Sequence, residues 1–174
     1  MTETLPILYV PAPILRQKAK PVGTGDADTV RTLAEKMLAT MYKAPGVGLA
    51  APQVGVGLRM VVLDCGPKDA PAPMVLVNPE LVAASQELAV REEGCLSLPN
   101  QFADVTRPYR VKVRYLSLDG AKQEVEGEGL LSACLQHEID HLDGKLFVDY
   151  LSILKRNMLL RRLAKELKAK VRED

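Results

Sequence analysis

The chain has 174 residues and a net charge of +1, and nearly half of its residues are hydrophobic while about a quarter are charged. This composition predicts a single globular domain spanning residues 1–174, and the near-neutral charge argues against nucleic-acid binding through the whole surface. No stretch approaches the roughly 18 apolar residues that a membrane span requires, and the N-terminus lacks the features of a secretory signal. The three cysteines are odd in number and widely spaced, which disfavours a disulfide framework. We therefore expect a cytoplasmic protein with reduced thiols and no membrane partner.

The N-terminal half predicts one helix followed by strands. A proline-rich opening segment reads as an extended arm with turns. An amphipathic helix is expected at roughly Asp28–Tyr42, because its apolar residues follow helical spacing and Pro45 ends it. A glycine-rich loop should cover Gly46–Gly57, and β-rich runs follow at Met60–Leu63 and Met74–Val77.

The C-terminal half predicts a hairpin and two helices. Val111–Leu116 alternates as a half-buried strand does, Asp119-Gly120 is a turn signal, and Lys122–Glu126 is the expected return strand. The pattern is helical from Leu130 to about Leu142. A terminal helix over about 152–172 carries an apolar stripe of Leu160, Leu163, Ala164, Leu167 and Val171. The expected class is α+β, with mostly antiparallel strands around a central helix, an N-terminal helix and a C-terminal helix.

Both histidines of the chain lie in the short stretch Gln136-His137-Glu138-Ile139-Asp140-His141. On a helix the two imidazoles stand one turn apart on the same face, where they can bind one metal ion. Glu138 can then handle protons on a water held by the metal. Leu130 and Cys134 share this face. The alternative interpretation of the two histidines and Glu138 is a polar surface face of the helix.

A catalytic metal site of this kind needs a third protein ligand. A downstream histidine is excluded, because Gly144 fits that longer motif but Phe147 stands where the histidine belongs. Glu166 lies on the basic terminal helix, and a surface charge is the favoured interpretation there. The third option is a cysteine. Cys95 lies in Glu93-Gly94-Cys95-Leu96-Ser97, where a small buried hydrophobe is the alternative interpretation. Cys134 lies on the histidine face, where lining the cavity is favoured over binding the metal, and Cys65 is interpreted as structural.

The stretch Gly46-Val47-Gly48-Leu49-Ala50-Ala51-Pro52-Gln53 is the third unusual feature. It lacks the Lys and Ser/Thr of a phosphate loop, and it is not a dinucleotide-binding turn. Its small residues let backbone approach a ligand closely, and the amide of Gln53 could donate to a developing oxyanion. A tight structural turn is the alternative.

In this order, G-V-G-L-A-A-P-Q, E-G-C-L-S and Q-H-E-I-D-H resemble the three signature motifs of the peptide deformylase family, and the resemblance covers roughly residues 5 to 155. It implies that Cys95, His137 and His141 hold the metal with water as fourth ligand, and that Glu138 is general base and then general acid. Gln53 and the backbone N–H of Leu96 would bind the oxyanion, and Arg107 would pair with Glu93. The residues that the resemblance assigns to substrate binding are Gly46, Val47, Gly48, Glu93, Gly94, Leu130 and Cys134.

The resemblance implies a metal-dependent hydrolase that removes the formyl group from N-formylmethionyl peptides and releases formate. The native ion would be Fe²⁺, with Zn²⁺, Ni²⁺ or Co²⁺ as substitutes, and the protein would be a monomer. A zincin-like endopeptidase and a structural metal module compete with this interpretation. The missing downstream histidine disfavours the first, and the lack of an obvious fourth protein ligand disfavours the second.

Positive charge is concentrated at the C-terminus, since Leu151–Asp174 holds eight Lys/Arg and three Asp/Glu. One interpretation is the solvated face of an amphipathic helix. The other, implied by the resemblance, is docking on ribosomal RNA, with ribosome association lost when the chain is cut at about Ile153.

Overall fold

The computed structural model describes residues 1–173 as two antiparallel sheets and three α-helices. The larger sheet has five strands in the order β1-β2-β3-β6-β7. Their bounds are Gly48–Ala50, Met60–Asp64, Pro73–Ala84, Arg110–Leu116 and Lys122–Glu128. The smaller sheet pairs β4 (Leu88–Cys95) with β5 (Leu98–Pro108).

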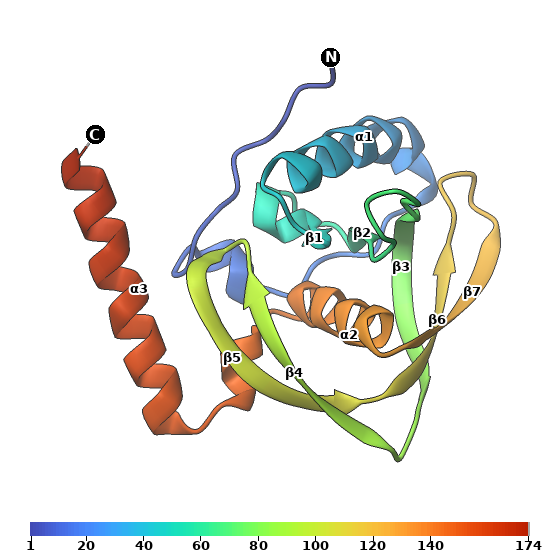
Figure 1. Ribbon diagram of the computed structural model, residues 1–174. Helices are drawn as coiled ribbons and strands as arrows, with labels where there is room; N and C mark the ends of the chain where they lie inside the picture. Colours follow the sequence, from blue (N-terminus) through green and yellow to red (C-terminus); the bar gives the residue numbers. More distant parts are fainter. Residues whose placement is uncertain (174) are drawn as a thin grey trace.

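The helices α1 (Ala27–Lys43), α2 (Leu130–Leu142) and α3 (Ile153–Glu173) each occupy a different place around the sheets. In Figure 1, α2 lies between the curved β4–β5 pair and the larger sheet, and α1 lies on the other side of β1 and β2. Short 3₁₀ turns at Pro13–Arg16, Thr24–Asp26, Ala51–Val54 and Phe147–Tyr150 complete the chain. The predicted class, α+β with a central helix and a helix at each end, is confirmed.

Strand β2 is the centre of the apolar core, because all five of its residues are buried. Successive side chains of β2 point to opposite faces of the sheet and pack against different helices. Val61 and Leu63 pack in the cluster that contains Leu135, Ile139 and Leu142 of α2. Met60 and Val62 pack in the cluster that contains the buried stripe of α1, namely Val30, Leu33, Ala34, Met37 and Met41. The strand thus fixes α1 and α2 on opposite faces of one sheet.

The predicted helices and the β6–β7 hairpin lie within two residues of their expected bounds. Strands β4 and β5 were not predicted as a pair, because β4 carries the charged run Arg91-Glu92-Glu93 and half of its residues are exposed. The predicted loop at Gly46–Gly57 contains the short strand β1 and the 3₁₀ turn at Ala51–Val54.

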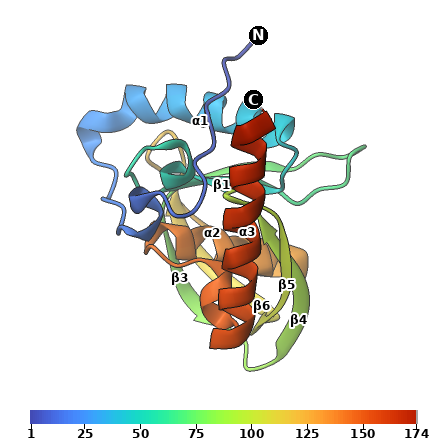
Figure 2. The ribbon, with the colours of Figure 1, turned by 90° about the vertical axis from the view of Figure 1, so that its left-hand side faces the viewer.

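Helix α3 packs along β5, as Figure 2 shows, and its buried residues are Leu159 and Leu163. They lie in a cluster with Leu98 and Val105 of β5 and with the turn at Phe147–Tyr150. The predicted stripe was wrong in part, since Ala164 is exposed and Val171 is 75% exposed. The contact face is rotated toward Leu159, and Val171 lies near the end of the helix, away from this cluster.

Within residues 1–173, none of the helices combines the length and the apolar character that a membrane crossing requires.

Leu163→Ala should lower the free energy of unfolding by about 2–5 kcal/mol, because it removes a side chain that is 2% exposed and leaves a cavity against β5. Met158→Ala is the matched control on the same helix, since Met158 is 52% exposed and its loss should cost about 0.5 kcal/mol or less. Denaturant unfolding measures both values. Equal losses in the two variants would contradict the packing of α3 described above.

Candidate active site

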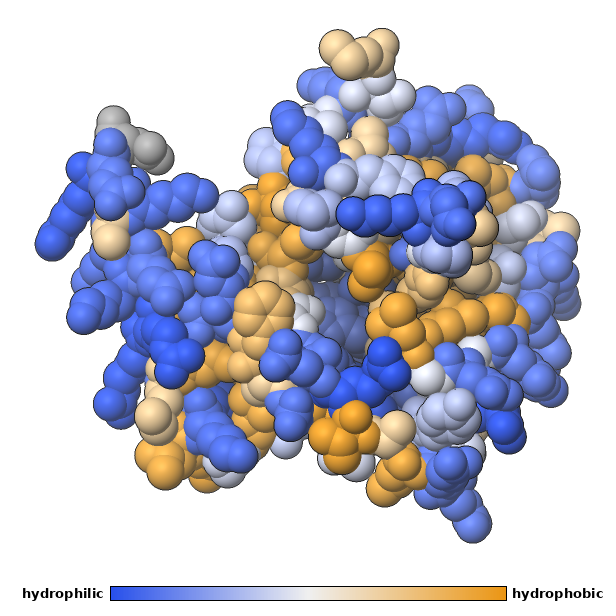
Figure 3. Space-filling model, viewed as in Figure 1, coloured by the Kyte–Doolittle hydropathy of each residue, from blue (hydrophilic) through white to orange (hydrophobic). Residues whose placement is uncertain are grey.

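The three sequence motifs line one cavity of about 590 Å³. Its walls come from the segment before β1, from β4 and the turn after it, and from α2. The mouth opens on the face drawn in Figure 3, where apolar side chains lie on the left and right of the hollow and hydrophilic ones lie below it. Three of them are large and exposed: Val47, Phe102 and Leu130.

Cys95, His137 and His141 form a cluster in which the ligand atoms all lie within 4.8 Å of one another. Sγ of Cys95 is 3.3 Å from Nε2 of His141, and the centroids of the two imidazole rings are 5.0 Å apart. One thiolate and two imidazoles are donors that suit zinc or iron. The arrangement could therefore hold one metal ion.

Strand geometry explains why a cysteine of β4 reaches histidines on α2. Gly94 pairs with Phe102 on β5, but the next residue, Cys95, pairs with Leu98. This irregularity is of the kind that bends a strand and re-aims its side chains. The end of β4 is thereby turned toward α2.

Glu93 connects the cysteine segment to the histidine helix. Its carboxylate accepts hydrogen bonds from Nε and Nη2 of Arg107, at 2.6 and 3.0 Å, and lies 3.0 Å from Nδ1 of His137. Burial acts to raise the pKa of Glu93, but the hydrogen bonds from His137 and Arg107 outweigh it and lower the pKa. A charged Glu93 can only accept, so Nδ1 of His137 carries the proton and Nε2 is free to bind a metal.

Glu138 is buried beside the metal-ligand cluster. Its Oε1 lies 3.7 Å from Nε2 of His137, and its Oε2 has no hydrogen-bond partner among the described residues. Burial raises the pKa of Glu138 to about 7, a value suited to proton exchange near neutral pH. Gly48 makes this position possible, because a Cβ at residue 48 would lie 3.0 Å from Cγ and Cδ of Glu138.

The carboxamide of Gln53 is fixed at both ends. Its Oε1 accepts a hydrogen bond of 2.9 Å from the N–H of Ala50, so Nε2 must face the cavity. Nε2 donates to Oγ of Ser97 at 3.1 Å and to Sγ of Cys95 at 3.4 Å. An amide donor thus stands directly beside the metal-ligand cluster.

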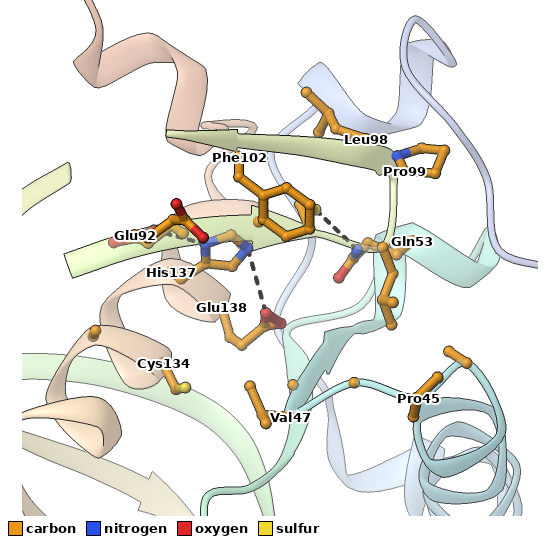
Figure 4. Close-up of a pocket in the computed structure, with 18 of the residues that line it drawn as sticks. Pro45, Val47, Gln53, Glu92, Leu98, Pro99, Phe102, Cys134, His137 and Glu138 are labelled. Atoms are coloured by element: carbon orange, nitrogen blue, oxygen red, sulfur yellow. Dashed lines mark hydrogen bonds and ion pairs between the residues drawn. The ribbon is translucent and has the colours of Figure 1, made fainter. Parts of the chain in front are cut away.

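The side of the cavity away from Gln53 is apolar. In Figure 4, Val47 and Cys134 lie together beyond Glu138, while Gln53, Leu98 and Pro99 lie at the opposite end. Leu130 belongs to the same apolar side. A hydrogen bond with the thiol of Cys65, together with burial, raises the pKa of the Cys134 thiol, which keeps it uncharged.

The structure brings together the residues that the sequence singled out. Cavity-lining residues from the prediction are Gly46, Val47, Gly48, Gln53, Glu93, Gly94, Cys95, Leu96, Leu130, Cys134, His137 and Glu138. His141 joins them through the metal-ligand cluster. Their catalytic and binding roles stay predictions.

Sequence reasoning missed several contributors to the site. Ile7 and Tyr9 of the N-terminal arm line the cavity, Ser97 holds Gln53, and Asp140 and Tyr150 reach the site through Arg107. Ser97 and Asp140 stand within two of the motifs, but their partners Gln53 and Arg107 lie more than thirty residues away, so the local pattern does not reveal these contacts. Glu166 is not simply a solvated charge, since its Oε2 accepts a hydrogen bond of 2.9 Å from the buried side chain of Gln101.

Comparison with known proteins gives a consistent result. A model of the polypeptide deformylase family matches residues 4–157. A peptide deformylase of Mesorhizobium japonicum is 53% identical over 166 residues, which cover 95% of this chain and 94% of that one.

Two solved structures are similar over most of the chain. A peptide deformylase from Legionella pneumophila has a TM-score of 0.90 at 49% identity, with 97% of this chain and 98% of that one covered. A Met-Ala-Ser-bound class I type b peptide deformylase from Acinetobacter baumannii has a TM-score of 0.82 at 38% identity, with 87% and 100% covered.

Arg107→Met should lower the free energy of unfolding by about 3–5 kcal/mol, because it leaves the buried carboxylate of Glu93 without its charged partner. Arg114→Met is the matched control. Arg114 also pairs with a glutamate, Glu124, but both side chains are exposed, so about 0–1 kcal/mol is expected. Denaturant unfolding of the metal-free proteins compares them, and similar losses would show that the Glu93–Arg107 pair is energetically no different from a surface pair.

Proposed function

The chain belongs to the polypeptide deformylase family, and we propose that it hydrolyses the N-terminal formyl amide of formylmethionyl polypeptides and releases formate. The observation that carries this proposal is the meeting of all three motifs around one cavity. We further propose that residues 1–174 act as one catalytic domain, because α3 buries Leu159 and Leu163 against β5.

The residues present fit a divalent metal ion. Cys95, His137 and His141 supply three donors, and the unpartnered Oε2 of Glu138 lies buried beside them. These three residues would hold the ion, which when bound supplies a Lewis acid that lowers the pKa of a water ligand to about 7 and polarises the formyl oxygen. We propose Fe²⁺ as the native ion, with Zn²⁺, Ni²⁺ or Co²⁺ as substitutes, since thiolate and imidazole suit all four.

The substrate site is a slot between two strand edges. Among the described residues, β1 ends the larger sheet and β4 pairs only with β5, so each strand has one edge without a strand partner. The segments Gly46–Gly48 and Arg91–Gly94 at these edges both line the cavity. An extended peptide can pair its backbone with such edges, as an added strand does.

The apolar side of the cavity suits a methionine side chain. Val47, Leu130, Cys134 and the ring of His137 provide an apolar surface with the uncharged Cys134 thiol at its base. Full burial of such a side chain stabilises the complex by roughly 1.5–3 kcal/mol. Among the similar structures, the Acinetobacter baumannii enzyme was solved with Met-Ala-Ser bound, which supports this assignment.

Glu138 moves the protons. The carboxylate takes a proton from the attacking water as the oxygen of that water bonds to the formyl carbon. The amide N–H of Leu96 and Nε2 of Gln53, held by Ala50 and Ser97, then donate to the tetrahedral oxyanion. Glu138 next delivers its proton to the leaving amine nitrogen, the C–N bond breaks, and formate and a free N-terminus result.

Glu138→Gln should lower kcat by about 10²–10⁴-fold, because the amide keeps the shape of the carboxylate but cannot accept the proton. Metal content should stay at the wild-type value, since Glu138 is not one of the three proposed ligands. The assay measures formate release from formyl-Met-Ala-Ser by anaerobically prepared, iron-loaded protein, with acetyl-Met-Ala-Ser as the control substrate. Absence of formate from the wild-type protein, or full activity in the variant, would contradict the proposal.

We also propose that α3 docks on ribosomal RNA. Its exposed basic residues include Lys155, Arg161, Arg162, Lys165, Lys168 and Lys170. Within residues 1–173 none of them forms a salt bridge, so they are available to phosphates. Cutting the chain at Ile153 is a poor test, because it also removes the buried Leu159 and Leu163.

Replacing Arg161, Arg162, Lys165 and Lys168 with Gln should abolish ribosome association while α3 stays folded, since Gln has a helix propensity close to those of Lys and Arg. Wild-type binding should weaken as salt rises. The matched control replaces the exposed Lys18, Lys20, Lys43 and Lys68 with Gln, which changes net charge equally. Co-sedimentation with ribosomes measures both, and equal binding by the two quadruple variants would refute the docking role of α3.

A further inference from the structure

The hydrogen bond that orients His137 is the first link of a chain that ends at the protein surface. Nδ1 of His137 lies 3.0 Å from Glu93, and Glu93 accepts two hydrogen bonds from Arg107. Nη1 of Arg107 donates to Oδ2 of Asp140 at 3.0 Å. The hydroxyl of Tyr150 donates to the same oxygen at 2.6 Å. Five side chains from four different elements are therefore linked in series.

Only one of the two histidines is held in this way. Nδ1 of His141 is buried and has no hydrogen-bond partner among the described residues. A histidine that binds a metal almost always donates its second ring N–H to a carboxylate, a carbonyl or a water. Among the described residues, His137 is therefore the histidine of this pair whose ring is oriented by a side-chain hydrogen bond, the one with Glu93.

Tyr150 limits the movement of Arg107 in two ways. The guanidinium carbon of Arg107 lies 4.7 Å from the centroid of the Tyr150 ring, so the ring supports the guanidinium plane. The hydroxyl fixes Oδ2 of Asp140, which in turn fixes Nη1. With Nη1 held, the rigid guanidinium presents Nε and Nη2 to Glu93 in one alignment. Tyr150 itself does not line the cavity.

We propose that Asp140 and Tyr150 are positioning residues for the metal site, which act through Arg107 and Glu93 to keep Nε2 of His137 aimed at Cys95 and His141. This inference rests on the proposed metal-binding role of those three residues. It assigns a role in metal retention to a surface hydroxyl that lies outside the three sequence motifs.

Tyr150→Phe tests the proposal, because it removes the hydroxyl and keeps the ring over Arg107. The measured quantity is the rate at which bound Zn²⁺ transfers to an excess of chromophoric chelator. Loss of a direct partner of a metal-binding histidine typically costs about 10–100-fold, so this more remote hydroxyl should raise the rate about 3–10-fold. In the iron-loaded enzyme kcat should fall while KM stays unchanged.

Tyr42→Phe is the matched control. Tyr42 and Tyr150 are both 48% exposed, and the Tyr42 hydroxyl donates to Asp64 at the same 2.6 Å distance. Among the described residues, Asp64 forms no hydrogen bond with Glu93 or Arg107, so Zn²⁺ release from Tyr42→Phe should match that of the wild type. Equal Zn²⁺ release rates in Tyr150→Phe and Tyr42→Phe would overturn the proposal, even if both variants unfold at a lower temperature.

A second variant tests the route. Asp140→Asn should accelerate Zn²⁺ release at least as much as Tyr150→Phe, and the double variant should match Asp140→Asn alone. If the rate increases of the two single variants multiply in the double variant, Tyr150 does not act through Asp140. A wild-type protein that retains no Zn²⁺ would instead contradict the proposed metal site, so the two failures are distinguishable.

Discussion

The fold depends on one constraint: α2 carries polar side chains through the interior of the protein, and a buried polar group is costly without a partner. Most of these groups find one. Gln136 bonds to Ser132 and to the carbonyl of Pro108, His137 to Glu93, and Asp140 to Arg107. Among the described residues, only three buried side-chain nitrogen or oxygen atoms lack a hydrogen-bond partner. Two of them, Oε2 of Glu138 and Nδ1 of His141, are on this helix. Two of the three unpartnered atoms therefore belong to the proposed metal site.

The rest of the architecture brings three separate segments to that place. Strand β2 fixes α2 and α1 on opposite faces of the large sheet, and Gly48 at the start of β1 lies beside Glu138. The irregularity at the end of β4 turns Cys95 toward the histidines. Helix α3 supports β5 from the outside through Leu159 and Leu163. Among the described residues, β1 and β4 each keep one edge without a strand partner, and the proposed site for an extended peptide lies between these two edges.

Much of this could be predicted from the sequence, and the failures have physical reasons. The helical periodicity of α1 and α2 and the alternation of β6 are local signals that survive folding, and the resemblance of three motifs identified the family correctly. Strand β4 was not predicted because its charged run Arg91-Glu92-Glu93 and its exposed residues do not give the alternating pattern of a half-buried strand. On α3, Leu160, Leu163 and Leu167 of the predicted stripe pack in the cluster with β5, whereas Ala164 and Val171 are exposed, since helical spacing alone does not say where a helix meets β5. Asp140 and Tyr150 were missed because their partner, Arg107, lies more than thirty residues away in the chain.

The central claim is that Cys95, His137 and His141 bind one metal ion. X-ray absorption at the zinc edge of the Zn²⁺-loaded protein tests it most directly, because sulfur scatters at about 2.3 Å and imidazole nitrogen at about 2.0–2.1 Å from zinc. We predict one zinc per chain with one sulfur and two nitrogen neighbours, and loss of the sulfur shell in Cys95→Ser. A zinc shell without sulfur in the wild-type protein, or a sulfur shell that persists in Cys95→Ser, would contradict the account.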